Sequence, residues 1–284
     1  MNTFTEDFEV TPATPETLAD LYALHPDRED AARRLEALRG RIATGHVQCA
    51  QALILRGPRG VEGTLLLAGN PAVPLFPRLW PDAPAPSVTA LLRSARAQVS
   101  PERCLILDGT RAPLGAAPAR AAGWVHTETH VLYETDLRAR TFAPDLGKQE
   151  AGAWEVSADA PAVRALLAEL GRADWQPDED EVLMALFGGA AEPLALGAVQ
   201  AAGRPDVATL DLIGVRPGQR GQGHGTRLHA HLLGWAAARG FTRHVGAADA
   251  GNLAMRRILA RYGARETTVQ EVYLPLVPQP PERV

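Results

Sequence analysis

Four glycines stand close together in the C-terminal half of the chain: Gly218, Gly221, Gly223 and Gly225. Glycine lets the backbone turn tightly and approach a ligand closely. The residues that follow have the apolar spacing of a helix, and the free N–H groups of a first helical turn form an anion site together with the helix dipole. The same stretch holds three arginines, which add local positive charge: Arg216, Arg220 and Arg227. The pattern predicts a phosphate or pyrophosphate ligand.

The spacing of the loop excludes two common phosphate motifs. A dinucleotide fingerprint requires G-x-G-x-x-G, but Thr226 stands where the third glycine belongs when the motif starts at Gly221. A P-loop requires a lysine after its second glycine, and His224 stands there instead. The pattern R-x-x-G-x-G does fit, as Arg220, Gly223 and Gly225.

Periodicity predicts the elements that position this loop. An apolar strand over 207–215 leads into it, and a helix over 224–239 follows, with a core-facing stripe that includes Leu228 and Leu232. The other elements expected in the second half are strands at 153–157, 193–200, 243–248 and 266–276, and helices at 160–171, 178–188 and 252–262.

The chain also repeats itself. Residues 104–137 and 244–276 share a strand–helix–Gly–strand pattern, with Gly123 matching Gly263 at an offset of 140 in the printed sequence. The domain starts match as well, since 8–21 resembles 154–167. We expect two similar α/β domains, although two units of one fold class can also look alike by chance.

The strand "ATLDLIGV", the loop and the segment "AADAGNLAMRRILARYGAR", with Asn252 eleven residues before Gly263, together resemble the GNAT superfamily of acyl-CoA-dependent N-acetyltransferases. The resemblance implies an α/β fold with a mixed sheet, in two tandem GNAT-like domains at 1–143 and 152–284. The first domain is expected to be degenerate, because a proline-rich segment, 74–97, replaces the glycine loop and proline has no N–H to offer.

By the same resemblance, the second domain holds acetyl-CoA as co-substrate. The residues expected to bind it are Ile213, Gly214, Val215, Arg220, Gly221, Gln222, Gly223, His224, Gly225, Thr226 and Asn252. Asn252 suits the N-cap of the helix at 252–262 equally well, so both roles stay open.

Three side chains are candidates for proton transfer. Asp211 is charged in an otherwise apolar strand and, by the two-residue period of a strand, shares one face with Thr209, Ile213 and Val215, so it is the candidate base. The family often has a tyrosine seven residues after the asparagine, where this chain has Leu259. Tyr262 or Tyr273 could replace it as the acid, or each could simply be packed.

One acidic segment bears on which amine accepts the acetyl group. Residues 173–183 place five carboxylates near Trp175, which would suit a cationic amine but equally suits a solvated helix start. His229 and His231 lie two apart on a helix and face different directions, so no metal site is expected.

The net charge and the hydropathy of the chain limit the partners and the location that we expect for the protein. A net charge of −4 argues against nucleic acid as a partner, and no apolar run reaches the ~20 residues that span a bilayer. We therefore expect a cytoplasmic monomer or homodimer that transfers acetyl to a primary amine of a small molecule. The alternatives are a non-catalytic acyl-CoA-binding or regulatory protein and an aminoacyl-tRNA-dependent transferase.

Overall fold

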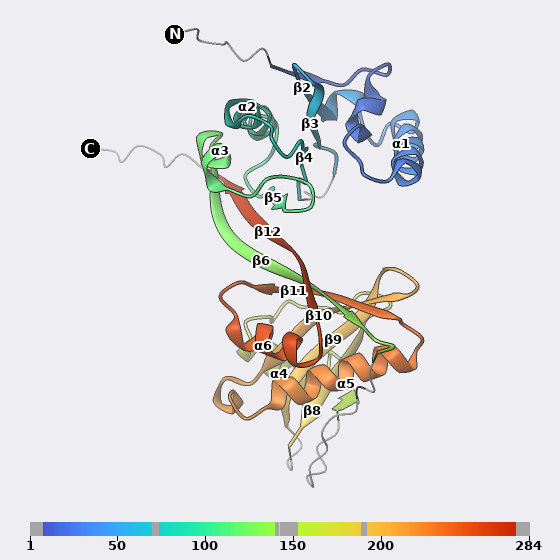
Figure 1. Cartoon of the computed structure of the whole chain (residues 1–284). Coiled ribbons are helices and arrows are strands. Elements are labelled where there is room, and N and C mark those ends of the chain that lie inside the picture. The colour runs from blue at the N-terminus through green and yellow to red at the C-terminus, as the bar shows by residue number, and fades with distance from the viewer. Residues whose placement is uncertain (1–7, 70–73, 140–141, 143–152, 189–191, 277–284) are drawn as a thin grey trace, which may run out of the picture. The chain divides into compact units, whose positions relative to one another are not determined.

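The computed structural model describes residues 8–69, 74–139, 142, 153–188 and 192–276. The chain divides into two compact units (Figure 1). Unit 1 contains the chain up to His130 together with the part from Thr268 onward, and unit 2 contains Val131–Thr267. These limits differ from the ranges 1–143 and 152–284 expected from the sequence, chiefly because residues from Thr268 onward belong to unit 1.

Unit 2 is a mixed sheet with helices on both faces. Its strands follow the order β12-β6-β11-β10-β9-β8-β7, in which β10 is parallel to β11 and antiparallel to β9. The strands are β7 (Ala153–Glu155), β8 (Val182–Phe187), β9 (Pro193–Arg204), β10 (Val207–Val215) and β11 (Arg243–Asp249). The helices are α4 (Pro161–Glu169), the short 3-10 helix η3 (Pro217–Gln219), α5 (His224–Ala238) and α6 (Leu253–Arg261).

Two apolar layers hold the helices of unit 2 against its sheet. On one face Leu228 and Leu232 of α5 pack on β8 and β9. On the other face Leu166 of α4 packs on Leu183 and Leu196. Figure 1 shows α5 lying across these strands. The amphipathic stripe predicted for α5 is therefore the surface that anchors the glycine loop to the sheet.

The helix expected at 178–188 is wrong, because residues 182–187 form strand β8. The run "VLMALF" is rich in helix formers, but its four central residues are all buried between α4 and α5 and pair with β9. A continuous short apolar run does not distinguish a buried strand from a buried helix. The structure has the other elements expected in this half, with limits shifted by a few residues.

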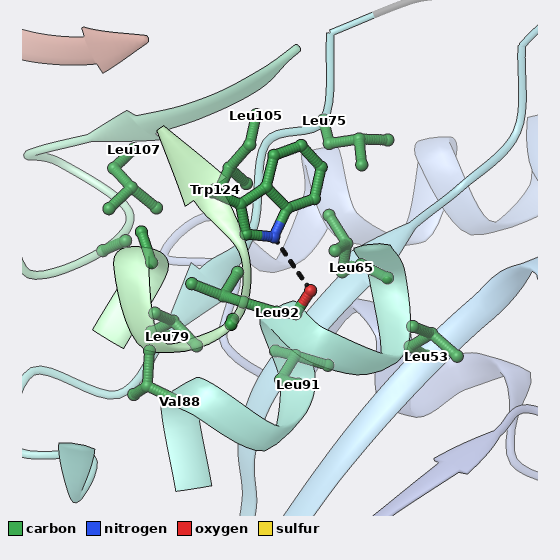
Figure 2. Close-up of a cluster of buried hydrophobic side chains, with 14 of the residues drawn as sticks. Leu53, Leu65, Leu75, Leu79, Val88, Leu91, Leu92, Leu105, Leu107 and Trp124 are labelled. Carbon is green, nitrogen blue, oxygen red and sulfur yellow. Dashed lines mark hydrogen bonds between the residues drawn. The ribbon is translucent and has the colours of Figure 1, made fainter. Parts of the chain in front are cut away.

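Unit 1 has a smaller sheet in the order β1-β2-β3-β4. Its elements are β1 (Glu9–Pro12), η1 (Leu18–Tyr22), α1 (Arg28–Ala43), η2 (Cys49–Gln51), β2 (Ala52–Gly57), β3 (Gly60–Leu66), β4 (Arg78–Leu79), α2 (Ala85–Arg96), β5 (Leu105–Asp108) and α3 (Ala116–Ala121). Trp124 is buried in its core, and the indole N–H donates to the Leu92 carbonyl at 3.0 Å (Figure 2).

Two long strands carry residues of both units. Strand β6 (Trp124–Asp136) and strand β12 (Arg265–Pro275) each cross the division of the chain. In unit 1, residues 270–273 of β12 pair with β5. The two strand–helix–Gly–strand patterns are both present, as β5-α3-β6 and β11-α6-β12. Gly123 and Gly263 both end their helices with positive φ, of 87° and 76°.

Candidate functional site

The first feature of the site is the parting of two neighbouring strands. Within the described residues, β10 pairs with β11 only from Val207 to Thr209, although β10 continues to Val215. On its other edge β10 stays paired with β9 to its end. The Arg216 N–H donates to Leu194, and bonding alternates along an antiparallel strand. The backbone N–H and C=O groups of Ile213 and Val215 therefore point to the edge where β11 has left.

A bulge at Asp211 changes the faces of β10. The register with β9 shifts between Leu210 and Leu212, so Asp211 has no partner opposite it. The expectation that Asp211 shares a face with Ile213 and Val215 is therefore wrong. Ile213 and Val215 pack toward α5, whereas the Asp211 carboxylate accepts a hydrogen bond from the Trp175 indole at 3.1 Å. A bulge adds one residue and reverses the alternation beyond it, which a period-two pattern cannot foresee.

The glycine loop ends β10 and begins α5. Gly221 and Gly223 have φ of 78° and 82°, a region that favours glycine, and Gly223 is the N-cap of α5 without any capping side chain. In the described part of the chain, the backbone N–H groups from Gly221 to Thr226 have no acceptor. The loop residues 221–223 are exposed, so these donors are open to a ligand.

Other glycines of the loop have different functions. A side chain at Gly225 would lie 3.3 Å from the Val215 side chain and 3.5 Å from that of Ile258. Gly225 therefore allows the first turn of α5 to pack closely on the end of β10. Gln222 is exposed and donates to the Gln219 side chain at 3.1 Å.

Two of the three arginines that were expected to add positive charge at the loop, Arg216 and Arg220, bond to the protein itself. Arg216 forms ion pairs with Glu192 at 2.7 Å and Glu169 at 3.4 Å, so its charge is neutralised by the protein. Arg220 donates to the Val215 carbonyl at 3.2 Å and remains exposed. Arg216 thus fixes the start of the loop, and Arg220 lies beside the open edge of β10.

His224 and Arg227 form a pair in the first turn of α5. The Arg227 guanidinium donates to His224 Nδ1 at 2.6 Å. Burial, together with the Arg227 charge, lowers the pKa of His224. Because a guanidinium only donates, Nδ1 must accept this bond, and the neutral imidazole then carries its proton on Nε2.

Asn252 caps helix α6, because its side-chain oxygen accepts from the Met255 N–H at 3.0 Å. This bond supports the capping role that the sequence left open. Asn252 itself is exposed.

Neither tyrosine has a free hydroxyl. Tyr262 donates to the Thr226 carbonyl at 3.1 Å and packs with the core beneath α5. Tyr273 lies in the core of unit 1, with its hydroxyl 2.6 Å from the Glu271 carboxylate. Burial, then Glu271, raises the pKa of Tyr273. Leu259 is buried. Tyr262 thus ties α6 to the first turn of α5, while Tyr273 is a packing residue of unit 1.

Acidic side chains border Asp211. Glu181 lies at the start of β8, and its Oε1 is buried with no hydrogen-bond partner among the described residues. Burial raises the pKa of Glu181, and the Asp211 and Asp178 carboxylates raise it further against the lowering effect of the Asp178 N–H. The backbone of Trp175 is held by Arg164, which donates to its carbonyl at 3.0 Å. Glu181 was not singled out from the sequence, where it is one of several neighbouring acids.

A buried pair of histidines, His229 and His244, lies where α5 meets β11. The rings of His229 and His244 are 5.8 Å apart, and His229 is 5.5 Å from the ring of Tyr262. Burial lowers the pKa of His229 to about 3 and that of His244 to about 4, with His244 also acting on His229. The sequence does not reveal this pair, because His244 belongs to β11 and lies fifteen positions beyond His229.

Comparison with known proteins agrees with this geometry. The sequence model described as "Acetyltransferase (GNAT) family" matches residues 146–264. Residues 146–264 are a GNAT acetyltransferase domain. This domain therefore belongs to the N-acyltransferase class of enzymes. No curated protein matches the sequence.

Solved GNAT structures share the fold across most of the chain. A GCN5-related N-acetyltransferase from Sphaerobacter thermophilus has a TM-score of 0.59 at 14% identity, over 95% of this chain and 96% of that one. A second GCN5-related N-acetyltransferase, from Kribbella flavida, has a TM-score of 0.53 at 16% identity, over 76% of this chain and 88% of that one. A tandem GNAT protein from the clavulanic acid biosynthesis pathway has a TM-score of 0.50 at 14% identity, over 96% of this chain and 100% of that one. At these identities the likeness concerns the fold.

In the described residues of the GNAT domain and of unit 1, no helix is long and apolar enough to cross a membrane.

Proposed function

We propose that this GNAT domain transfers the acetyl group of acetyl-CoA to a primary amine of a small molecule. The observation that carries the proposal is the combination of an open strand edge and an uncapped helix start. The unpaired edge of β10 ends at the glycine loop, and the loop presents the unpartnered N–H groups of residues 221–226. A pantetheine arm is an amide chain that can pair with a strand, and a pyrophosphate is the anion that suits such a helix start.

The residues present fit acetyl-CoA in two places. Ile213 and Val215 would pair with the pantetheine amides, and one of their N–H groups would polarise the thioester carbonyl. The N–H groups of Gly221 to Thr226 would hold the pyrophosphate, with Arg220 beside them. When bound, the coenzyme supplies an activated acyl group with a thiolate leaving group. Asn252, exposed at the start of α6, remains a candidate contact for the pantetheine arm.

The two neighbouring carboxylates, Asp211 and Glu181, suit a cationic acceptor amine. Asp211 and Glu181 interact electrostatically, and the raised pKa of Glu181 brings this carboxylate closer to neutral pH, where a general base works best. We infer that the pair attracts the ammonium form of the amine and that Glu181 or Asp211 removes its proton. The amine nitrogen then forms a bond to the carbonyl carbon, the carbon–sulfur bond breaks, and the thiolate leaves with its electron pair and takes up the second proton that the nitrogen loses. A thiol has a pKa of about 8.5, so this departure needs no tyrosine acid.

The proposal includes a tandem arrangement in which only the second GNAT-like domain binds coenzyme. In unit 1, helix α2 has Pro84 as its N-cap and a further proline in its first turn. Proline carries no N–H, so this helix start lacks the row of donors that α5 offers. The coenzyme site is therefore assigned to unit 2.

Replacing Gly223 by Val tests the coenzyme site. The left-handed backbone at Gly223 resists a β-branched side chain, so the loop must change shape and lose its aimed N–H groups. Gly203→Val is the matched control, because Gly203 has φ of 66°, has no neighbouring atom within 4 Å, and lies near the end of β9, away from the loop. We expect Gly223→Val to weaken coenzyme A binding at least tenfold in calorimetry, and Gly203→Val to leave it unchanged. Equal affinity in both variants would contradict the proposal.

A second measurement separates an enzyme from a binding protein. The chain is incubated with acetyl-CoA and a panel of primary amines, with acids and alcohols as controls, and thiol release is followed. Turnover with amines supports the transferase. Coenzyme binding without turnover on any acceptor would favour the acyl-CoA-binding alternative.

A further inference from the structure

Unit 1 contains a cavity of about 320 Å³ that the transferase chemistry does not use. It lies among strand β4, the segment 109–113 after β5, and the residues that precede α1. Part of its wall is apolar, from Leu24, Leu79 and Pro81, and two arginines, Arg78 and Arg111, complete it. Its volume is at the lower end of the range for small-molecule sites, about 300–1,000 Å³.

Hydrogen bonds of the backbone hold the two arginines on one wall. The Leu79 N–H donates to the Arg111 carbonyl at 2.7 Å, which joins β4 to the turn after β5. The N–H groups of Arg111 and Ala112 both donate to the Asp108 carbonyl at 2.8 Å. The Arg111 guanidinium lies 5.2 Å from the centre of the Phe76 ring, which orients it further. The backbone of the two arginine-bearing segments is thus fixed, and the Phe76 ring orients the Arg111 side chain.

Within the described residues, neither guanidinium group has a carboxylate at ion-pair distance. Among the residues that the structure describes, neither Arg78 nor Arg111 has an ion pair or a side-chain hydrogen bond. Burial, followed by the charges of Arg111 and Arg34, lowers the pKa of Arg78. Like charges held together at a partly buried wall are costly unless an anion neutralises them.

The nearby acids are already engaged by other groups. Asp108 accepts from the hydroxyl and N–H of Thr110 at 2.6 and 2.9 Å, and from Gln270 at 2.6 Å. Asp30 is paired with Arg34 at 2.6 Å and with Arg33 at 2.9 Å. Asp108 offsets part of the charge of both Arg78 and Arg111, but neither carboxylate lies within ion-pair distance of the two cavity arginines.

We propose that this cavity binds a small organic anion, with Arg78 and Arg111 on its carboxylate or phosphate group and the leucine and proline side chains on its apolar body. Arginine is well suited to both anions, because its planar fork can donate two parallel hydrogen bonds. The proposal concerns unit 1 alone and does not depend on the transferase function of unit 2. It gives the proline-rich segment that replaces the glycine loop a ligand of its own, since Arg78 belongs to that segment.

The test uses the full chain and three probes of similar shape: phenyl phosphate, benzoate and the neutral benzamide. Binding is measured by calorimetry for the wild type, Arg78→Gln, Arg111→Gln and the control Arg39→Gln. Arg39 is an exposed residue of α1 that is not among the cavity residues. We expect at least one anion to bind, benzamide not to bind, and each cavity variant to weaken the anion about tenfold or more. Arg39→Gln should leave the affinity unchanged.

Two further variants keep the outcome decisive. Arg78→Lys retains the charge and should recover part of the affinity, which also guards against misfolding of Arg78→Gln. Gly223→Val removes the other anion site, the glycine loop, and should not affect these probes. Stronger binding of phenyl phosphate identifies a phosphate ligand, and stronger binding of benzoate identifies a carboxylate. Failure of both anions to bind, or loss of binding in Gly223→Val but not in the arginine variants, would overturn the proposal.

Discussion

At the scale of single residues, Asp211 shows how one position can mislead. Its charge in an apolar strand pointed correctly to a special place, and the bulge explains why a charge is tolerated there. The bulge also turns the carboxylate toward Trp175 and Glu181 rather than toward the face of Ile213 and Val215. The partner that the sequence did not reveal is Glu181, whose burial depends on the fold of β8.

The Asp211–Glu181 pair predicts a specific pH dependence. Because the folded environment raises the pKa of Glu181, kcat/KM should rise with pH as Glu181 loses its proton. Glu181→Gln should remove this rise and reduce kcat by about 100-fold. Asp211→Asn removes a like charge, so the rise should move to lower pH. The exposed neighbour Glu179 provides the control, and Glu179→Gln should keep the wild-type profile. A rise that survives in Glu181→Gln would exclude Glu181 as the base.

The buried histidines predict acid sensitivity of unit 2. His229 and His244 have folded pKa values of about 3 and about 4, below the unfolded value of 6.5. Their stabilising effect is therefore complete above pH 6.5 and is lost as the pH falls, because the unfolded chain binds two more protons. Between about pH 5.5 and 4.5 the pair lowers the free energy of unfolding by about 2.7 kcal/mol for each unit by which the pH falls.

Denaturant titrations of His229→Leu over pH 4.5–7 check this slope. The variant should lose about half of it, or about 1.4 kcal/mol per unit. His130→Gln, a change at a partly exposed histidine, should leave it intact. An unchanged slope in His229→Leu would show that other groups cause the acid sensitivity.

At the scale of elements, the sequence predicted those with a clear period or a clear end. The amphipathic α5, the strand β10 and the helix α6 with its Asn252 cap all form within a few residues of their expected limits. Strand β8 was missed because its burial on both faces removes the alternation. The parting of β10 from β11 was missed as well, since it depends on pairing between distant segments. These two features shape the candidate site, and each depends on contacts between segments that are far apart in the sequence.

Two helix glycines predict opposite effects of the same substitution. Gly40 is exposed in α1, and a Cβ there would meet no atom within 4 Å. Gly40→Ala should stabilise the protein by about 1 kcal/mol, because alanine is the better helix former. At Gly234 in α5 a Cβ would lie 2.7 Å from the Phe142 carbonyl oxygen. Gly234→Ala should destabilise by about 1–3 kcal/mol, since a backbone group must move. Thermal unfolding of the two variants distinguishes them, and stabilisation by Gly234→Ala would refute the contact.

At the scale of the whole molecule, the sequence indicated two similar halves, and the structure divides the chain differently. The repeat predicted a cut near residues 143–152, whereas unit 1 takes its strand partner for β5 from residues 270–273. Tyr273 illustrates the consequence, because this residue of the C-terminal half is buried in the core of unit 1. Repeat analysis compares segments and does not show which unit each strand joins.

A truncated chain tests this division. Residues 1–150 contain the whole first repeat but lack the β12 residues that pair with β5. We expect this fragment to be poorly soluble and to show no cooperative thermal transition, because an apolar strand edge and the Tyr273 site are left open. Joining residues 268–276 to residue 130 through a flexible linker should restore a cooperative transition. A fragment 1–150 that unfolds cooperatively would favour two sequential domains instead.

The pairing of β12 with β5 also bears on synthesis. The side chains of Asp108 and Gln270 meet across 162 positions of the chain. A growing chain leaves the ribosome from its N-terminus, and the residues of unit 2 are contiguous from Val131 to Thr267. All of unit 2 is therefore synthesised before the last strand segment of unit 1. Unit 1 can therefore be completed only after unit 2 has been synthesised, and until then β5 lacks the strand that residues 270–273 provide.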